Sequence, residues 1–148
     1  ISILFQVDIS RKPFRHKSLA ASIIDSQGAQ GTLQAFELDD VPFDVKRVFT
    51  VCGAKPNSKR GLHAHKRCMQ ALFCLHGSIE VVMDDGITKS QGLLKPNGTG
   101  ILIENGIWTE QNYIEYQSVL LVFCDQPFEE KDYIRDYQEF LLWRNSSR

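Results

Sequence analysis

No hydrophobic run in this chain approaches the length of a membrane span, and neither sign of charge dominates it. A membrane-spanning helix needs about 20 consecutive apolar residues. The 17 lysines and arginines nearly balance the 18 aspartates and glutamates, for a formal net charge of -1. Without a global field of one sign, neither a nucleic acid nor a membrane is an expected partner. An anionic ligand would have to be met by local cations.

Cysteine is also sparse, and no two cysteines form a C-x-x-C pair. Three of the four lie inside apolar runs, which is typical of buried, reduced thiols and not of a disulfide framework or a zinc knot. The cysteines are Cys52, Cys68, Cys74 and Cys124. The apolar start at residues 1–5 is too short for the core of a signal peptide. We therefore expect a cytoplasmic protein, although a chain that begins at Ile1 is either trimmed or a piece of a longer polypeptide.

The chain of 148 residues, 43% hydrophobic, is sufficient for one buried core and predicts a single domain. Short β-rich runs recur between turn signals, and residues 43–52 alternate between apolar and polar side chains. Further runs cover residues 69–75, 78–83, 99–103 and 118–124. The sequence Asp84-Asp85-Gly86 predicts a hairpin turn. Regular short strands of this kind predict an all-β sandwich or barrel.

The periodicity changes near the carboxyl end of the chain. Tyr133, Ile134, Tyr137, Phe140 and Leu141 recur at helical spacing, which predicts one amphipathic helix over residues 131–143 that packs on the sheet. We divide the domain into an N-terminal extension (1–22), a barrel (23–128) and a C-terminal helix and tail (129–148).

The most informative local feature is His63-Ala64-His65. On an extended strand, side chains two residues apart project from the same face, so both imidazoles point into one space. Imidazole is suited both to proton transfer and to metal binding near neutral pH. The alternative is that the two rings only make hydrogen bonds within a barrel. His16 lies in a polar stretch and His76 precedes a turn glycine, and both settings favour a surface position.

The spacing that follows the pair resembles the first signature of the cupin barrel. Four residues separate His65 from Gln70, and six separate Gln70 from Gly77. In that signature the residue at position 70 is a metal-binding glutamate, and the second signature has a histidine where this chain has Thr109. Two imidazoles, an amide and a hydroxyl are a poor ligand set for iron, manganese or zinc. We therefore expect neither a metal nor another cofactor.

Longer motifs resemble the dTDP-sugar 3,4-ketoisomerases, also described as WxcM-like cupins. The match runs in the same order from about residue 23 to about residue 142. It rests on Pro42-Phe43-Asp44-Val45-Lys46-Arg47-Val48, Arg60-Gly61-Leu62-His63-Ala64-His65-Lys66, Gly77-Ser78, Asp84-Asp85-Gly86, Gly106-Ile107-Trp108 and Asp132-Tyr133-Ile134-Arg135-Asp136-Tyr137. The resemblance implies a cupin (a double-stranded β-helix, or jelly roll) with a C-terminal helix.

The resemblance also implies an activity and a site. The expected reaction moves a ketone from carbon 4 to carbon 3 of a dTDP-4-keto-6-deoxyhexose, during deoxyamino-sugar biosynthesis. His63 is the candidate base and His65 the partner that shuttles protons or polarises oxygen, although their roles are exchangeable. One ring would be neutral, and the other either protonated or hydrogen-bonded to a sugar oxygen. Arg60 is the candidate for the diphosphate, because a guanidinium forms paired bonds to phosphate oxygens.

The remaining candidates for substrate binding are Gln70, Arg47, Thr50, Trp108 and Thr109. Arg47 is the weaker cation, because we expect it on the solvent-facing side of its strand. Gln70 is either a core amide or a pocket residue, and Trp108 is either a barrel wall or a platform for the base. Related ketoisomerases resemble closely associated dimers, so the resemblance implies that this chain forms a homodimer.

Three departures from the family's pattern keep two other functions open. Related chains have an arginine where this one has Gln30, adjacent tyrosines where it has Phe49-Thr50, and a histidine where it has Thr109. One alternative is a degenerate cupin that binds a nucleotide sugar without turnover. The other is a metal-dependent cupin enzyme.

Overall fold

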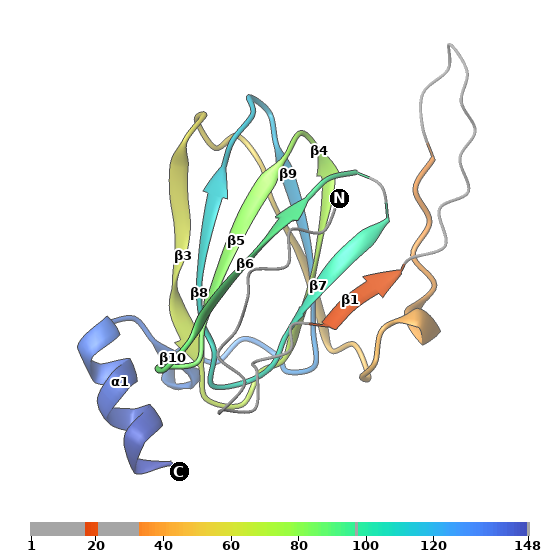
Figure 1. Ribbon diagram of the computed structural model, residues 1–148. Coiled ribbons are helices and arrows are strands. Elements are labelled where there is room, and N and C mark those ends of the chain that lie inside the picture. The colour runs from red at the N-terminus through yellow and green to blue at the C-terminus, as the bar shows by residue number, and fades with distance from the viewer. Residues whose placement is uncertain (1–16, 21–32, 97, 148) are drawn as a thin grey trace.

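A computed structural model describes residues 17–20, 33–96 and 98–147, and within them ten strands form two antiparallel sheets that face each other (Figure 1). The first sheet has the order β1-β7-β4-β9-β2 and the second the order β10-β3-β8-β5-β6. The strands are β1 (Lys17–Ala20), β2 (Arg47–Val51), β3 (Ser58–His65), β4 (Gln70–His76), β5 (Ile79–Asp84), β6 (Lys89–Leu94), β7 (Thr99–Ile103), β8 (Trp108–Tyr113), β9 (Val119–Cys124) and β10 (Tyr133–Ile134). Two 3₁₀ turns, η1 (Leu38–Asp40) and η2 (Glu130–Asp132), and the helix α1 (Tyr137–Ser146) complete the described elements.

The path of the chain is that of a jelly roll. From β2 onward the chain changes sheet at every connection except the β5–β6 hairpin, so neighbours within a sheet are distant in sequence. The predicted all-β class with a C-terminal helix is confirmed.

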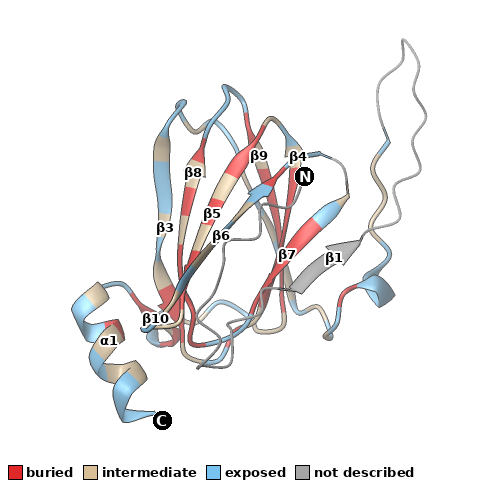
Figure 2. Ribbon diagram, in the orientation of Figure 1, coloured by how far each residue is buried: buried red, intermediate tan, exposed pale blue. Residues whose placement is uncertain are grey.

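The core lies between the inner faces of the two sheets, where Figure 2 shows buried segments along most strands. Strand β5 illustrates the alternation that produces it. Ile79, Val81 and Met83 are fully buried, whereas Glu80 and Val82 between them are partly exposed. Strand β5 thus contributes every second side chain to the core.

Strands β4 and β9 are apolar on both faces, because their outer face is covered as well. Phe73 and Phe123 lie there in a second cluster with Phe36, Phe43 and Val45. The alternation predicted for residues 43–52 is therefore divided: Phe43 and Val45 pack outside the barrel, whereas Phe49 and Val51 pack against the inner core.

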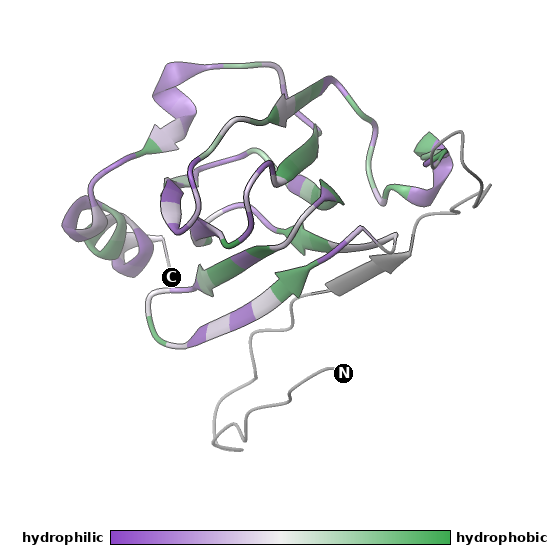
Figure 3. Cartoon of the chain, turned by 90° about the horizontal axis from the view of Figure 1, so that it is seen from above, coloured by the Kyte–Doolittle hydropathy of each residue, from purple (hydrophilic) through white to green (hydrophobic). Residues whose placement is uncertain are grey.

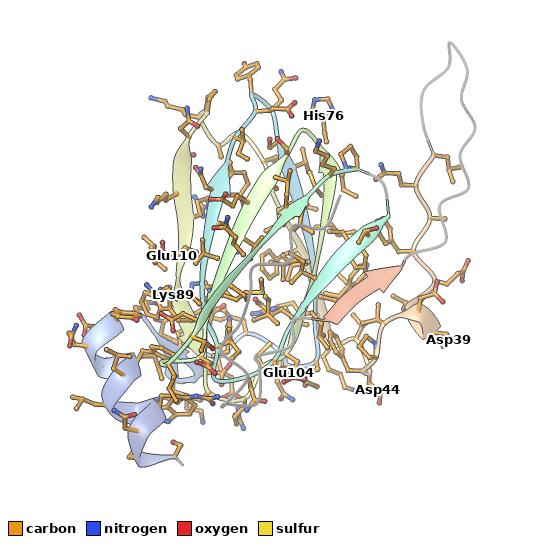
Figure 4. All side chains as sticks on the ribbon, in the orientation of Figure 1. Asp39, Asp44, His76, Lys89, Glu104 and Glu110 are labelled. Carbon is orange, nitrogen blue, oxygen red and sulfur yellow. The ribbon has the colours of Figure 1, made fainter. Side chains whose placement is uncertain are left out.

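Helix α1 covers the outer face of the second sheet near β10. Phe140 packs with Ala64, Trp108 and Ile134, and the rest of the helix alternates between polar and apolar segments, as Figure 3 shows. Figure 4 places Lys89 beside this helix, where its ammonium lies 5.4 Å from the Tyr137 ring centroid. Through Phe140, the helix covers the apolar outer face formed by Ala64, Trp108 and Ile134.

The predicted start of this helix at residue 131 is wrong. Residues 130–132 form η2, and Tyr133 and Ile134 pair with His65 and Ala64 on β3. Asp136 then caps the helix by accepting a hydrogen bond from the Glu139 backbone N–H. The helical spacing of Tyr133 and Ile134 is overridden by this strand pairing.

The turn between β5 and β6 confirms the predicted hairpin, but it contains four residues. Asp84 pairs with Lys89, and the Asp85 carboxylate accepts from the backbone N–H groups of Ile87 and Thr88. Gly86 adopts a φ of 86°, in the left-handed region that glycine occupies without steric cost.

Strands β3, β6 and β8 have no counterpart among the predicted runs except at the histidine pair. Their outward-facing positions carry charged or polar side chains, which dilutes the apolar pattern. All four cysteines are described as free thiols. Cys74 and Cys124 are buried, as expected, and so is Cys68, whereas Cys52 at the end of a predicted run is exposed. Residues 17–20, assigned to an N-terminal extension, pair with β7 as β1. No described helix is long and apolar enough to cross a membrane.

Candidate active site

The two histidines lie at the end of β3, on the face that points between the sheets. His63 is partly exposed, His65 is 4% exposed, and their ring centroids are 5.0 Å apart. Each ring donates its Nδ1–H to an oxygen: His63 to the Gly61 carbonyl at 2.8 Å, and His65 to the Asp132 carboxylate at 2.9 Å. This assignment follows because both partners are acceptors only. In the neutral rings, the two Nε2 lone pairs are therefore available to a ligand.

A β-bulge brings Arg60 to the same face as the histidines. An odd separation of three residues would normally place Arg60 and His63 on opposite faces. The register shifts between Gly61 and His63, so Arg60 pairs with Gln111 while His63 pairs with Thr109, two residues away on β8. Gly61 and Leu62 adopt φ values of 80° and 54° at the bulge. Burial raises the pKa of Tyr113 to about 12, and the charge of Arg60, whose side chain is exposed, opposes this, which supports the orientation of Arg60 toward Tyr113.

The Asp132 carboxylate anchors His65 from the other end of the chain. It is 5% exposed and also accepts the Arg67 backbone N–H at 2.8 Å. The pairing of β10 with β3 holds Asp132, the residue before β10, next to this ring. A buried carboxylate with several N–H donors is fixed in position and in turn fixes the His65 tautomer.

Tyr133 is a further component of the site that the sequence analysis did not single out. Its ring centroid lies 5.0 Å from that of His63 and 4.3 Å from that of His65. The Arg135 guanidinium stacks on its ring at 4.3 Å. The motif Asp132-Tyr133-Ile134-Arg135 was the signal for this residue in the sequence, but it served only as part of the family resemblance.

Burial makes both imidazoles weaker bases than free histidine. For His63, burial lowers the pKa to about 4, and the hydrogen bond to the Gly61 carbonyl opposes this only in part. For His65, burial also lowers the pKa, opposed by the bond to Asp132. Both rings are therefore neutral at neutral pH, which favours the expected alternative of a hydrogen-bonded ring over a protonated one.

The expectation that Arg47 faces solvent is wrong. Its side chain shares the inward parity of Phe49, and its Nη2 donates to the Cys124 sulfur at 3.4 Å. Among the groups that the structure describes, the buried Nε has no hydrogen-bond partner. Arg47 thus presents an unused buried donor beside Cys124.

The residues at the four positions where a cupin holds its metal do not form a suitable ligand set in this chain. Gln70 is buried, and its amide donates to the Cys124 sulfur at 3.6 Å. Thr109 is buried and lies opposite His63 in the register. Two imidazoles, an amide and a hydroxyl supply none of the anionic oxygen that such metals prefer.

Two candidates are not brought to the histidines. Thr50 is exposed on the outer side of β2, opposite in parity to Arg47. Trp108 lies on the outer face of the second sheet, where it packs against Phe140 under α1. Trp108 is therefore an outer wall covered by the helix and not a platform inside the barrel. Gln30 lies outside the described residues.

Comparison with known proteins identifies the same family that the sequence motifs resemble. A family model described as FdtA: WxcM-like, C-terminal matches residues 16–145. The chain is 35% identical over 118 residues to a TDP-4-oxo-6-deoxy-alpha-D-glucose-3,4-oxoisomerase from Aneurinibacillus thermoaerophilus, covering 80% of this chain and 84% of that protein.

Two solved structures are similar over most of their length. The crystal structure of a 3,4-ketoisomerase from Helicobacter canadensis has a TM-score of 0.79 at 35% identity, covering 88% of this chain and 97% of that chain. A mutant of the 3,4-ketoisomerase QdtA from Thermoanaerobacterium thermosaccharolyticum, in complex with TDP-4-keto-6-deoxyglucose, has a TM-score of 0.81 at 26% identity, covering 91% and 97%. The predicted cupin-type jelly roll agrees with these neighbours.

Proposed function

The chain belongs to the FdtA family of WxcM-like, C-terminal domains, and from this membership we propose that it is a 3,4-ketoisomerase acting on a dTDP-4-keto-6-deoxyhexose. The observation that carries the proposal is the shared inward face of His63, His65 and Arg60 in a chain 35% identical to a named 3,4-oxoisomerase. Two bases beside one cation suit a charged nucleotide sugar whose reaction is proton transfer.

His63 is the base that removes the proton from carbon 3. Its pKa of about 4 leaves Nε2 unprotonated at neutral pH, so the lone pair is available without a prior deprotonation. Removal of this proton gives an enediolate across carbons 3 and 4. Return of a proton to carbon 4 leaves the ketone at carbon 3, with no net change in oxidation state.

His65 moves the second proton, from the oxygen on carbon 3 to the oxygen on carbon 4. Its Nε2 is buried and makes no hydrogen bond within the described residues, so it is left for the substrate. When Nε2 takes the proton, the ring becomes a cation, and the Asp132 carboxylate at 2.9 Å stabilises that charge. Each such positioned transfer contributes typically about 10²- to 10⁴-fold in rate.

The experiment that tests this function is incubation of the protein with the 4-keto substrate in heavy water. We expect a 3-keto product that carries deuterium at carbon 4, because the proton on His63 exchanges with solvent. Unchanged substrate with saturable binding would instead identify a cupin that binds without turnover. The departures at Phe49, Thr50 and Thr109 make that outcome worth testing directly.

The acid limb of the pH profile is a second prediction. Because the pKa of His63 is lowered to about 4, kcat/KM should remain constant as the pH falls through 6.5 and decline only near pH 4. The value of kcat/KM falls on the acid side because protonation of the base removes its lone pair. Initial rates over pH 3.5–8 test this, with folding monitored at each pH. A limb near 6.5 would mean that His63 is not buried in the working enzyme.

Arg60 is the proposed contact for the diphosphate. We expect Arg60→Gln to weaken binding of dTDP by about ten- to a hundredfold, since a hydrogen bond to a charged group contributes about 1.5–3 kcal/mol. Lys59→Gln is the matched control, because Lys59 is the preceding cation and pairs with Asn112 on the outer face of the same strands. Isothermal titration with dTDP measures both. Equal losses in the two variants would rule out a specific role for Arg60.

A cytoplasmic homodimer completes the proposal. Exposed apolar side chains support pairing of two copies, among them Leu62 at 44% and Leu93 at 53% exposure on the second sheet. Sedimentation at micromolar concentration checks this, and the mass of a single chain would contradict it.

A further inference from the structure

We propose that Cys68, Asp132 and His65, with Cys124 as a fourth ligand, form an inhibitory site for a thiophilic divalent cation such as Zn²⁺. The three groups offer one sulfur, one oxygen and one nitrogen that all lie within 4.8 Å of one another. All three residues are buried. This is a different ligand set from the four cupin positions, which supply no sulfur.

The geometry is close to what tetrahedral zinc requires. Zinc bonds of about 2.0–2.3 Å place neighbouring ligand atoms roughly 3.3–3.8 Å apart. His65 Nδ1 and Asp132 Oδ2 are already 2.9 Å apart, so they need only a small separation to admit the ion. The Cys68 backbone N–H points to the same carboxylate oxygen at 3.4 Å, which holds this residue beside Asp132.

Cys124 supplies a second sulfur near Cys68. Each thiol acts on the other: Cys124 raises the pKa of Cys68, and Cys68 lowers the pKa of Cys124 to about 6. Arg47 and Gln70 both donate to the Cys124 sulfur, at 3.4 and 3.6 Å. Donors directed at sulfur stabilise the thiolate, the form that binds a metal. Two thiolates, a carboxylate and a neutral imidazole are a suitable set for Zn²⁺.

Occupation of this site would stop the proposed isomerisation. Zinc replaces the Nδ1 proton of His65 and the thiol protons, which are released to solvent. The ring then loses its hydrogen bond to Asp132, and a dication on Nδ1 opposes the positive charge that the shuttle must carry. This consequence rests on the proposed function, whereas metal binding itself does not.

Cobalt provides the direct test, because thiolate bonds to Co²⁺ give a charge-transfer absorption band in the near ultraviolet. With reductant present and one equivalent of Co²⁺, we expect the band in the unmodified chain and its loss in Cys68→Ser. Cys52→Ser and Cys74→Ala are the matched controls and should keep it: Cys52 is exposed, and the buried Cys74 donates to the His76 carbonyl, away from the cluster. Cys124→Ser is the second variant if Cys68→Ser does not fold.

His63→Asn separates this site from a cupin metal site. It should retain the band, because His63 is not a ligand in the proposed cluster, whereas a metal at the cupin positions requires it. A band that survives both Cys68→Ser and Cys124→Ser, or that His63→Asn removes, overturns the proposal. Zn²⁺ should also reduce turnover of the unmodified chain at least tenfold, reversibly with a chelator, but should leave the turnover of Cys68→Ser at its own metal-free rate. Absent turnover with an intact cobalt band would count against the proposed function alone.

Discussion

Replacement of His63 by asparagine is expected to reduce kcat about 10²- to 10⁴-fold, the range that a single positioned proton-transfer group supplies. Asparagine preserves a polar side chain of similar size but has no basic nitrogen. The hydrogen bond to the Gly61 carbonyl can be kept by the new amide, so the bulge that orients Arg60 has no reason to change. Affinity for dTDP should therefore be nearly unaffected.

The split between turnover and binding is what identifies a base. We expect kcat to fall while the dissociation constant of dTDP stays within about threefold, and deuterium incorporation to stop. His76→Asn is the control, because His76 is exposed at the end of β4, at the opposite end of the barrel from β10 (Figure 4). If His63→Asn turns over at the unmodified rate, His65 or another group must be the base.

Replacement of Asp132 by asparagine is the second large effect, with kcat expected to fall about a hundredfold. The amide removes the negative charge that stabilises protonated His65, and it can present an N–H in place of an acceptor. Because the bond to Asp132 opposes the effect of burial, its loss should lower the pKa of His65 further. The variant should remain folded, since an amide oxygen can still accept the Arg67 backbone N–H.

Asp125→Asn separates positioning of the ring from support of the backbone. The Asp125 carboxylate accepts the Met69 backbone N–H at 2.8 Å, so it stabilises the same segment without touching a histidine. A role of Asp132 through His65 predicts a large loss of kcat and a changed pH profile for Asp132→Asn alone. Comparable losses in both variants, at comparable melting temperatures, would show that Asp132 acts only on the backbone.

Several parts of the molecule follow from local sequence pattern. The alternation in residues 79–83, the β-rich runs 69–75 and 118–124, and the turn at Asp85-Gly86 each depend on residues close in the chain. The common face of His63 and His65 follows from the two-residue repeat of a strand. The motifs around this pair also indicated the family, which the comparisons confirm.

Other parts depend on register and on contacts between distant segments. Arg60 joins the histidines only because one extra residue, Leu62, is accommodated between β3 and β8. Trp108 is covered by a helix from the end of the chain. No periodicity in the sequence reports the bulge or this cover. Arg47 was expected on the solvent-facing side of its strand, but the two-residue repeat of β2 places it inward with Phe49.

The sequence by itself determined the fold class, the family and the two imidazoles, because periodicity and motif spacing are properties of neighbouring residues. The tertiary structure decided which groups surround those imidazoles. Asp132 reaches His65 across 67 residues through the pairing of β10 with β3, and that same pairing interrupts the helix expected there. Burial, which sets the pKa of both rings, exists only once the two sheets have closed around them.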